Sequence, residues 1–182
     1  MKMMKKVLAL ALAGAMALCV LTGCGSGGGG SNAVSTDDLV KALNETGAAK
    51  FEVAQNVTPK PADIQRVQDR INKELQKYPS YTITDAVEFV MAEELMSNLD
   101  GEKIGAETKG ICAVVEKSSK MSASTLAAQV VKNVTVITLT KTSDDSARLS
   151  RKNTTLNVNN TYKIASVTLD TDKGVCTLVL FY

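Results

Sequence analysis

Segments with helical spacing and segments typical of strands fall in different parts of the chain, and this order restricts the fold more than any other feature. Before residue 133, apolar side chains recur every three or four positions, as on the buried face of a helix. Three of four stretches rich in Val, Ile, Thr and Leu follow residue 130, and only a short turn separates the last two. Strands in such succession pair antiparallel, because a parallel pair needs a long crossover connection. The order favours an α+β fold over a doubly wound parallel sheet.

Four helices are expected from their spacing and their end signals. Ser35 is suited to cap the first helix, and Gly47 is suited to end it. Pro61 fits the first turn of the second helix, and Pro79 stops it. The third helix is apolar around more than half of its circumference, so we expect it at the centre of the core. The four expected helices cover residues 35–47, 61–78, 84–99 and 122–132.

The second helix has a charged side, and the third has a recognisable N-terminal cap. The second has a narrow apolar stripe and a strongly charged opposite side, which indicates a surface helix with one seam inward. The third helix has Thr84 as its expected N-cap, with Asp85 in the first turn. The charged side of the second helix carries Arg66, Asp69, Arg70, Lys73 and Lys77.

Four strands complete the expected fold. The last two are joined by residues 171–174, whose Asp and Gly are typical of a hairpin turn. The sequence therefore predicts an antiparallel sheet of about four strands, mostly in the C-terminal half, with three to four helices on one of its faces. The expected strands cover residues 111–116, 134–142, 162–170 and 175–181.

The N-terminus has the pattern of an export signal. Three lysines within the first six residues precede an apolar run over residues 7–20, which is shorter than a membrane-spanning helix needs. The run ends in Leu21-Thr22-Gly23-Cys24, which resembles the lipobox of bacterial lipoproteins. The resemblance implies cleavage before Cys24, a diacylglycerol on its sulfur, and anchoring at the extracytoplasmic face of the cell membrane. Ordinary secretion, with Cys24 incidental, is the alternative.

The sequence divides into three parts. Residues 1–23 are the expected signal peptide, and residues 24–34 are the lipidated Cys with a Gly/Ser-rich tether. Such a tether behaves as a flexible coil, because glycine offers no side chain to pack. Residues 35–182 are expected to form a single α+β domain held to the membrane through the lipid on Cys24.

The complete absence of His excludes catalysis by an imidazole base and metal sites built on imidazole. Glu88, Glu93 and Glu94 are candidate acid–base carboxylates, but they lie on the polar side of the third helix, where a solvated face explains them. Residues 118–120 contain Ser and Lys without the spacing of a Ser-Lys catalytic motif. We expect no cofactor and no metal, and an enzyme without His is the less favoured function.

Cys112 and Cys176 each enter an expected strand after a Lys-Gly pair. Export would permit a disulfide between them, which the chain-entropy model credits with about 4 kcal/mol. The alternative is two buried free thiols that act as small apolar residues. A reactive or metal-binding role is the third interpretation.

A basic segment in the C-terminal half is the candidate for ligand binding. Residues 37–107 carry a net charge of −6 and residues 108–182 a net charge of +5. Arg148, Arg151 and Lys152 are spaced to share one face of a short helix capped by Ser143, where they would also complement the helix dipole.

The Asn-rich residues 153–161 follow directly. Cations suit phosphates and amides suit sugar hydroxyls, so the segment is a candidate site for an anionic envelope polymer. Basic surface interleaved with aromatics, as nucleic-acid binding needs, is missing from the sequence. The sequence favours a non-enzymatic binding or interaction module, with an envelope polymer or a protein as its partner.

Overall fold

The protein has four helices and a six-stranded mixed sheet in the part of the chain that the computed structural model describes, residues 33–55, 61–97, 107–141 and 147–182. The expected signal peptide and the lipid-bearing Cys24 lie outside these residues. The helices are α2 (Thr36–Glu45), α3 (Pro61–Lys77), α4 (Ile83–Ser97) and α5 (Ala123–Lys132), with a 3₁₀ turn η2 (Ser118–Lys120) before α5. The strands are β1 (Lys50–Val53), β2 (Glu107–Glu116), β3 (Val134–Lys141), β4 (Ala147–Asn153), β5 (Thr161–Thr171) and β6 (Gly174–Phe181).

The prediction of an α+β fold is confirmed. The predicted number of about four antiparallel strands is too low, because the sheet has six strands. The strand order is β1-β5-β6-β2-β3-β4. β1 runs parallel to β5, with Lys50 opposite Thr161, and every other neighbouring pair is antiparallel. The two strands that sequence spacing missed, β1 and β4, form the two edges of the sheet.

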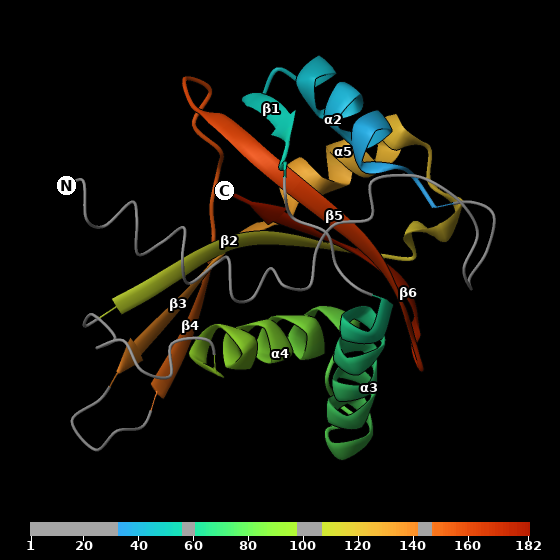
Figure 1. Ribbon diagram of the computed structural model, residues 1–182, viewed down its shortest axis with the longest axis vertical. Helices are drawn as coiled ribbons and strands as arrows, with labels where there is room; N and C mark the ends of the chain where they lie inside the picture. Colours follow the sequence, from blue (N-terminus) through green and yellow to red (C-terminus); the bar gives the residue numbers. More distant parts are fainter. Residues whose placement is uncertain (1–32, 56–60, 98–106, 142–146) are drawn as a thin grey trace.

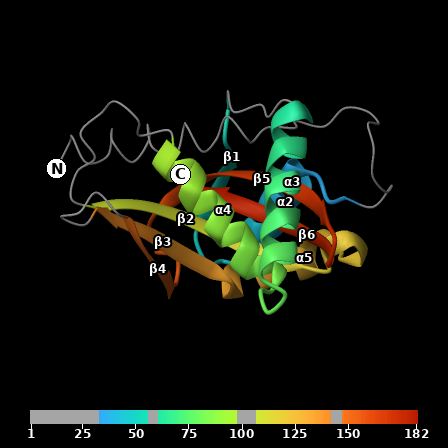
Figure 2. The ribbon, with the colours of Figure 1, turned by 90° about the horizontal axis from the view of Figure 1, so that it is seen from below.

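Helices cover both faces of the sheet, so the expectation that they occupy one face is wrong. Figure 1 shows α2 and α5 on one side of the sheet and α3 and α4 on the other, and Figure 2 shows α3 and α4 in front of the strands. The central strands are apolar on both faces. Val114 and Leu178 pack with α3 and α4, whereas Val115 and Val179 pack with α2 and α5. Period-two alternation sends neighbouring residues to opposite cores.

The expected helix starts agree with the structure where a serine caps them. The hydroxyl of Ser35 accepts a hydrogen bond from the backbone N–H of Asp38, and that of Ser122 accepts one from Thr125. The N-cap of α4 lies two residues earlier than expected. Thr82, and not Thr84, exchanges the capping hydrogen bonds with Asp85.

The β5–β6 hairpin forms where the sequence predicts it. Thr171 pairs with Gly174, whose φ of +129° is a conformation that L side chains rarely adopt. In the described part of the chain, no helix is both long and apolar enough to span a bilayer.

Candidate functional site

The three cations expected to share a helix face lie instead on strand β4, at the edge of the sheet. Arg151 and Lys152 are neighbours on this strand and therefore fall on opposite faces, because side chains alternate along a strand. β4 pairs along its whole length with β3. These non-local hydrogen bonds outweigh the local signal for a short helix. The expected cluster of Arg148, Arg151 and Lys152 is therefore divided between two faces, and the side chain of Arg148 is outside the described part.

Arg151 is engaged with two carboxylates of α4. Its Nη1 atom lies 2.8 Å from Oε2 of Glu88 and 2.9 Å from Oδ1 of Asp85. Glu88 is only 4% exposed, so its expected place on a solvated polar face is wrong. Hydrogen bonds to Glu88 and then to Asp85 raise the pKa of Arg151. Arg151 thus neutralises a buried carboxylate and joins β4 to α4. The side chains of Glu93 and Glu94 are outside the described part.

Asp85 is held in its ionised form. Burial acts to raise the pKa of this carboxyl, but hydrogen bonds from Thr82 and the ion pair with Arg151 outweigh it and lower the pKa below 3.8.

Ser118, part of the Ser and Lys candidate that the sequence indicated over residues 118–120, accepts a buried hydrogen bond from Thr177. These polar groups therefore stabilise the packing of α4 and of η2.

The Asn-rich stretch after β4 is held by bonds within itself and to Tyr162. The backbone N–H of Asn157 and the side-chain amide of Asn160 both donate to the Tyr162 hydroxyl, at 3.2 and 3.4 Å. Asn159 donates its backbone N–H to the Asn157 side chain at 3.0 Å. These contacts order a loop, and they use polar groups that the sequence suggested for sugar recognition.

The two cysteines are free and buried, and the strand register keeps them apart. Cys112 lies opposite Leu180, and Cys176 lies opposite Glu116, four positions further along β2. Four positions correspond to roughly 13 Å, whereas a disulfide requires Cα atoms within about 7 Å. Of the interpretations left open by the sequence, the structure therefore has the two buried free thiols and not the disulfide.

Both thiols are unsuited to reaction. Burial raises the pKa of Cys112 to about 12, with a smaller contribution from the charge of Glu88. Burial, followed by the charge of Glu116, raises the pKa of Cys176 to about 12. Because the thiolate is the nucleophile and the metal ligand, these environments argue against both roles. Within the described ranges, no three Cys, Asp or Glu side chains gather as a metal site would need.

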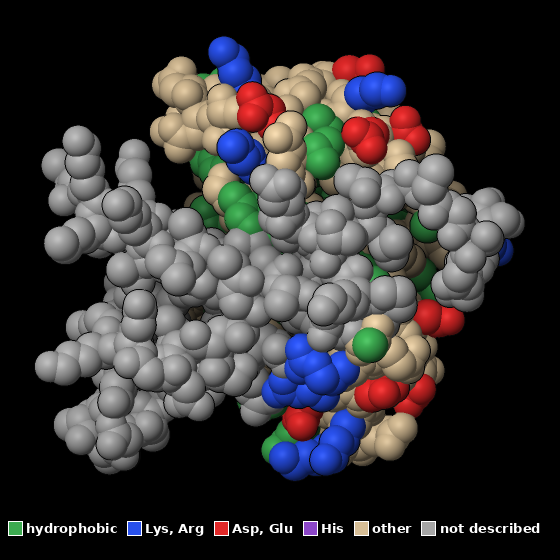
Figure 3. All heavy atoms as spheres, in the orientation of Figure 1, with side chains coloured by type: hydrophobic (Ala, Val, Ile, Leu, Met, Phe, Trp, Pro, Cys, Tyr) green, Lys and Arg blue, Asp and Glu red, His purple; other side chains and the backbone are tan. Residues whose placement is uncertain are grey.

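A different set of cations lies together on the outer side of α3. Arg66, Arg70, Lys73 and Lys77 are spaced i, i+4, i+7 and i+11, which places them within an arc of about 60° on the helix surface. We call these four residues the α3 cationic stripe. Figure 3 shows Lys and Arg side chains gathered over α3 at the lower end of the molecule.

The buried face of α3 places the α3 cationic stripe on the side of the helix that faces away from the core. Val67, Ile71 and Leu75 are at most 3% exposed and belong to the core between α3, α4 and the sheet. The stripe lies on the opposite side of the helix, as the charged side of an amphipathic helix must. The sequence identified these cations as a solvated face. Their spacing of four, three and four residues already indicated a continuous charged line along the helix.

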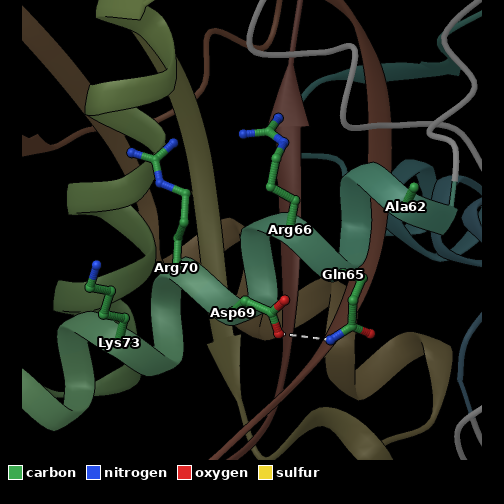
Figure 4. Close-up of a pocket in the computed structure, with 6 residues that line it drawn as sticks. All are labelled: Ala62, Gln65, Arg66, Asp69, Arg70 and Lys73. Carbon is green, nitrogen blue, oxygen red and sulfur yellow. Dashed lines mark hydrogen bonds between the residues drawn. The ribbon is translucent and has the colours of Figure 1, made fainter.

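A shallow, open depression runs beside the stripe. Figure 4 shows Arg66, Arg70 and Lys73 leaving α3 in the same direction, while Gln65 donates a hydrogen bond to Asp69 at 2.8 Å. The hydrogen bond draws Asp69 toward Gln65, one turn earlier on the helix. The depression is lined by Ala62, Gln65, Arg66, Asp69, Arg70 and Lys73.

Comparison with known proteins adds no family to this geometry. The chain matches no protein-family model, no curated protein and no solved structure.

Proposed function

We propose that the mature chain is a lipid-anchored, extracytoplasmic binding module of the cell envelope, and not an enzyme. The support for anchoring is the lipobox-like Leu21–Cys24 run after an apolar segment and before a Gly-rich tether. A chain without His lacks the commonest general base, which favours binding over catalysis.

The α3 cationic stripe is the proposed binding surface, and it is the observation that carries the function. Four cations spread along about 16 Å of helix form a line of positive charge with roughly one cation per turn. A linear polymer with regularly spaced phosphates matches such a line better than a compact ligand does. The partner is therefore an anionic envelope polymer of the teichoic-acid type, bound through α3 and not through the expected Arg148, Arg151 and Lys152.

Binding of poly(glycerol phosphate) tests the surface. The probe protein is the mature chain with Cys24→Ser, so that no lipid is present, and binding is measured at low and at physiological salt. We expect the combined variant Arg66→Gln, Arg70→Gln and Lys73→Gln to bind at least tenfold more weakly. The slope of log affinity against log salt should also fall by about two to three, since each released counterion contributes somewhat less than one.

A matched control removes three cations elsewhere. Lys50, Lys120 and Lys132 are exposed and lie on β1, η2 and α5. Their combined change to Gln alters the net charge equally and should leave the affinity within about twofold. Equal losses in both variants would mean that only overall charge matters. Binding to anionic phospholipid vesicles but not to the polymer would replace the polymer by the membrane surface as partner.

Cell fractionation tests the anchor separately. Cys24→Ala in the full chain should release the protein from the membrane fraction and abolish labelling with a fatty-acid probe, because no sulfur remains to carry diacylglycerol. Unchanged membrane association and unchanged labelling of this variant would refute lipidation at Cys24.

A further inference from the structure

A pair of stacked tyrosines stands at the C-terminal end of the α3 cationic stripe. The rings of Tyr78 and Tyr81 are 4.8 Å apart between centroids and inclined by 26°. Tyr81 is partly buried and packs against the core beneath α3 and α4. Tyr78 is 37% exposed, one of two large hydrophobic residues that remain exposed in the described part of the chain. The pair is thus an aromatic surface in which Tyr81 packs against the core and part of Tyr78 is exposed.

The loop that carries the tyrosines is tightly held. The backbone N–H of Tyr81 donates to the carbonyl of Tyr78 at 2.9 Å, and that of Tyr78 donates to Glu74 in α3. Lys173, in the β5–β6 turn, donates its ammonium to the carbonyls of Pro79 and Tyr81, at 2.8 and 2.6 Å. An aromatic surface that is ordered before binding loses little conformational entropy when a ligand stacks on it.

Charge and aromatic surface meet at Lys77. The Nζ atom of this last member of the stripe lies 4.9 Å from the centroid of the Tyr78 ring. The Tyr78 ring is thus in contact with both the Tyr81 ring and the Lys77 ammonium. Such contacts at exposed positions are weak, and a phosphate is the stronger partner for an ammonium. A phosphate beside Lys77 would compete with the Tyr78 ring for the ammonium, so the phosphate and the next group of the polymer would meet Lys77 and Tyr78 together.

We propose that the polymer bound by the α3 cationic stripe carries sugar units, and that Tyr78, supported by Tyr81, is the stacking surface for one of them. This inference rests on the proposed function. The C–H face of a sugar ring packs on an aromatic face, while its hydroxyls stay in water. A ligand with phosphates and sugars on one chain engages Lys77 and Tyr78 together, whereas a plain phosphate chain engages only the cations.

Two polymers of equal phosphate content test the proposal, poly(glycerol phosphate) with and without glucosyl substituents. The mature chain with Cys24→Ser should bind the glucosylated polymer about tenfold more tightly, by analogy with bases that stack on aromatic side chains. Tyr78→Ala should abolish this preference and leave affinity for the plain polymer within about twofold. Tyr78→Phe, which keeps the ring and loses the hydroxyl, should retain the preference.

The outcomes separate this proposal from the one beneath it. Equal affinity of the original protein for the two polymers, or a preference that survives Tyr78→Ala, overturns the sugar-stacking role while the cationic surface stands. Loss of all polymer binding in Tyr78→Ala, with its circular dichroism and urea midpoint unchanged, overturns the role as well, because the cations alone should still bind the plain chain. Failure of the original protein to bind either polymer overturns the proposed function itself.

Discussion

Removing Arg151 should destabilise the protein through the carboxylate it leaves behind. Glu88 is 4% exposed and belongs to an α4 face whose neighbours, such as Val87 and Met91, are in the core. Removal of one partner from a buried ion pair costs about 3 to 5 kcal/mol of folding free energy. The side chain of Arg151 is 42% exposed, so solvent already screens part of the interaction. We therefore expect Arg151→Met to lower the free energy of unfolding by about 3 kcal/mol, the lower end of that range.

A double-mutant cycle separates the ion pair from the packing around it. In urea, a loss of about 3 kcal/mol lowers the midpoint by about 1.5 M when the m-value is about 2 kcal/mol/M. Glu88→Met leaves only the better solvated Arg151, which still has Asp85 as a partner, so it should cost about 1 kcal/mol. The double variant should be within about 1 kcal/mol of the original protein, because apolar replacements of a buried pair are often neutral.

The control is Lys152→Met, one residue further along β4. Its side chain lies on the opposite face of the strand and is exposed, so its loss should change stability by less than about 0.5 kcal/mol. An Arg151→Met variant no less stable than this control would refute the reasoning. A double variant whose loss equals the sum of the two single losses would also refute it, since the two side chains would then act independently.

Three further predictions concern acid, thiols and a helix cap. Because the pKa of Asp85 is lowered in the folded chain, its ionised form stabilises the fold above pH 3.8, and this stabilisation is lost as the pH falls through the pKa of the folded state. Asp85→Asn should therefore flatten the acidic part of a plot of the urea midpoint against pH. An unchanged plot would contradict this. With pKa values near 12, Cys112 and Cys176 should react with a thiol reagent at pH 8 only after denaturation. Rapid labelling of the folded mature chain with Cys24→Ser, in which they are the two remaining cysteines, would disprove their burial. Ser122→Ala removes the hydroxyl that accepts from Thr125 and should cost about 1 kcal/mol in thermal or urea unfolding, whereas no loss would show that water replaces the cap.

The helices and the last hairpin could be predicted because their signals are local. Ser35 and Ser122 cap the helices that they precede, and Pro61 begins α3. Residues 171–174 join β5 to β6. In each case a few neighbouring residues specify the backbone, so sequence spacing is sufficient.

The two edge strands could not be predicted in this way. β1 has four residues, and its partner in β5 begins at Thr161, more than a hundred positions later. β4 has charged residues spaced as on a helix, and its strand conformation depends on the ladder with β3. Strand formation depends on neighbours in space more than on intrinsic preference, which explains both omissions.

The second helical layer had a signal that was available in the sequence. Residues 175–181 form an almost continuous apolar run, which is typical of a strand buried on both faces. An antiparallel strand with one solvated face alternates apolar and polar residues instead. β6 occupies the middle of the sheet, between β5 and β2, and Leu178 and Val179 face different cores. The run therefore required helices on both sides, although the antiparallel order suggested one.

The ion pair between Arg151 and the buried Glu88 constrains the register in which β4 pairs with β3. Arg151 lies opposite Ile137 in the β3–β4 ladder and faces α4. A slip of one residue in this ladder would turn Arg151 to the other face and bring Ser150 or Lys152 toward Glu88. Ser150 has no charge for the buried carboxylate, and Lys152 offers a compact ammonium without the planar guanidinium that reaches both Asp85 and Glu88. The ion pair thus favours one register for an edge strand that is mostly polar, with Ala147 and Leu149 as its two apolar residues. We infer that this selection of register is why a charge is retained inside the core.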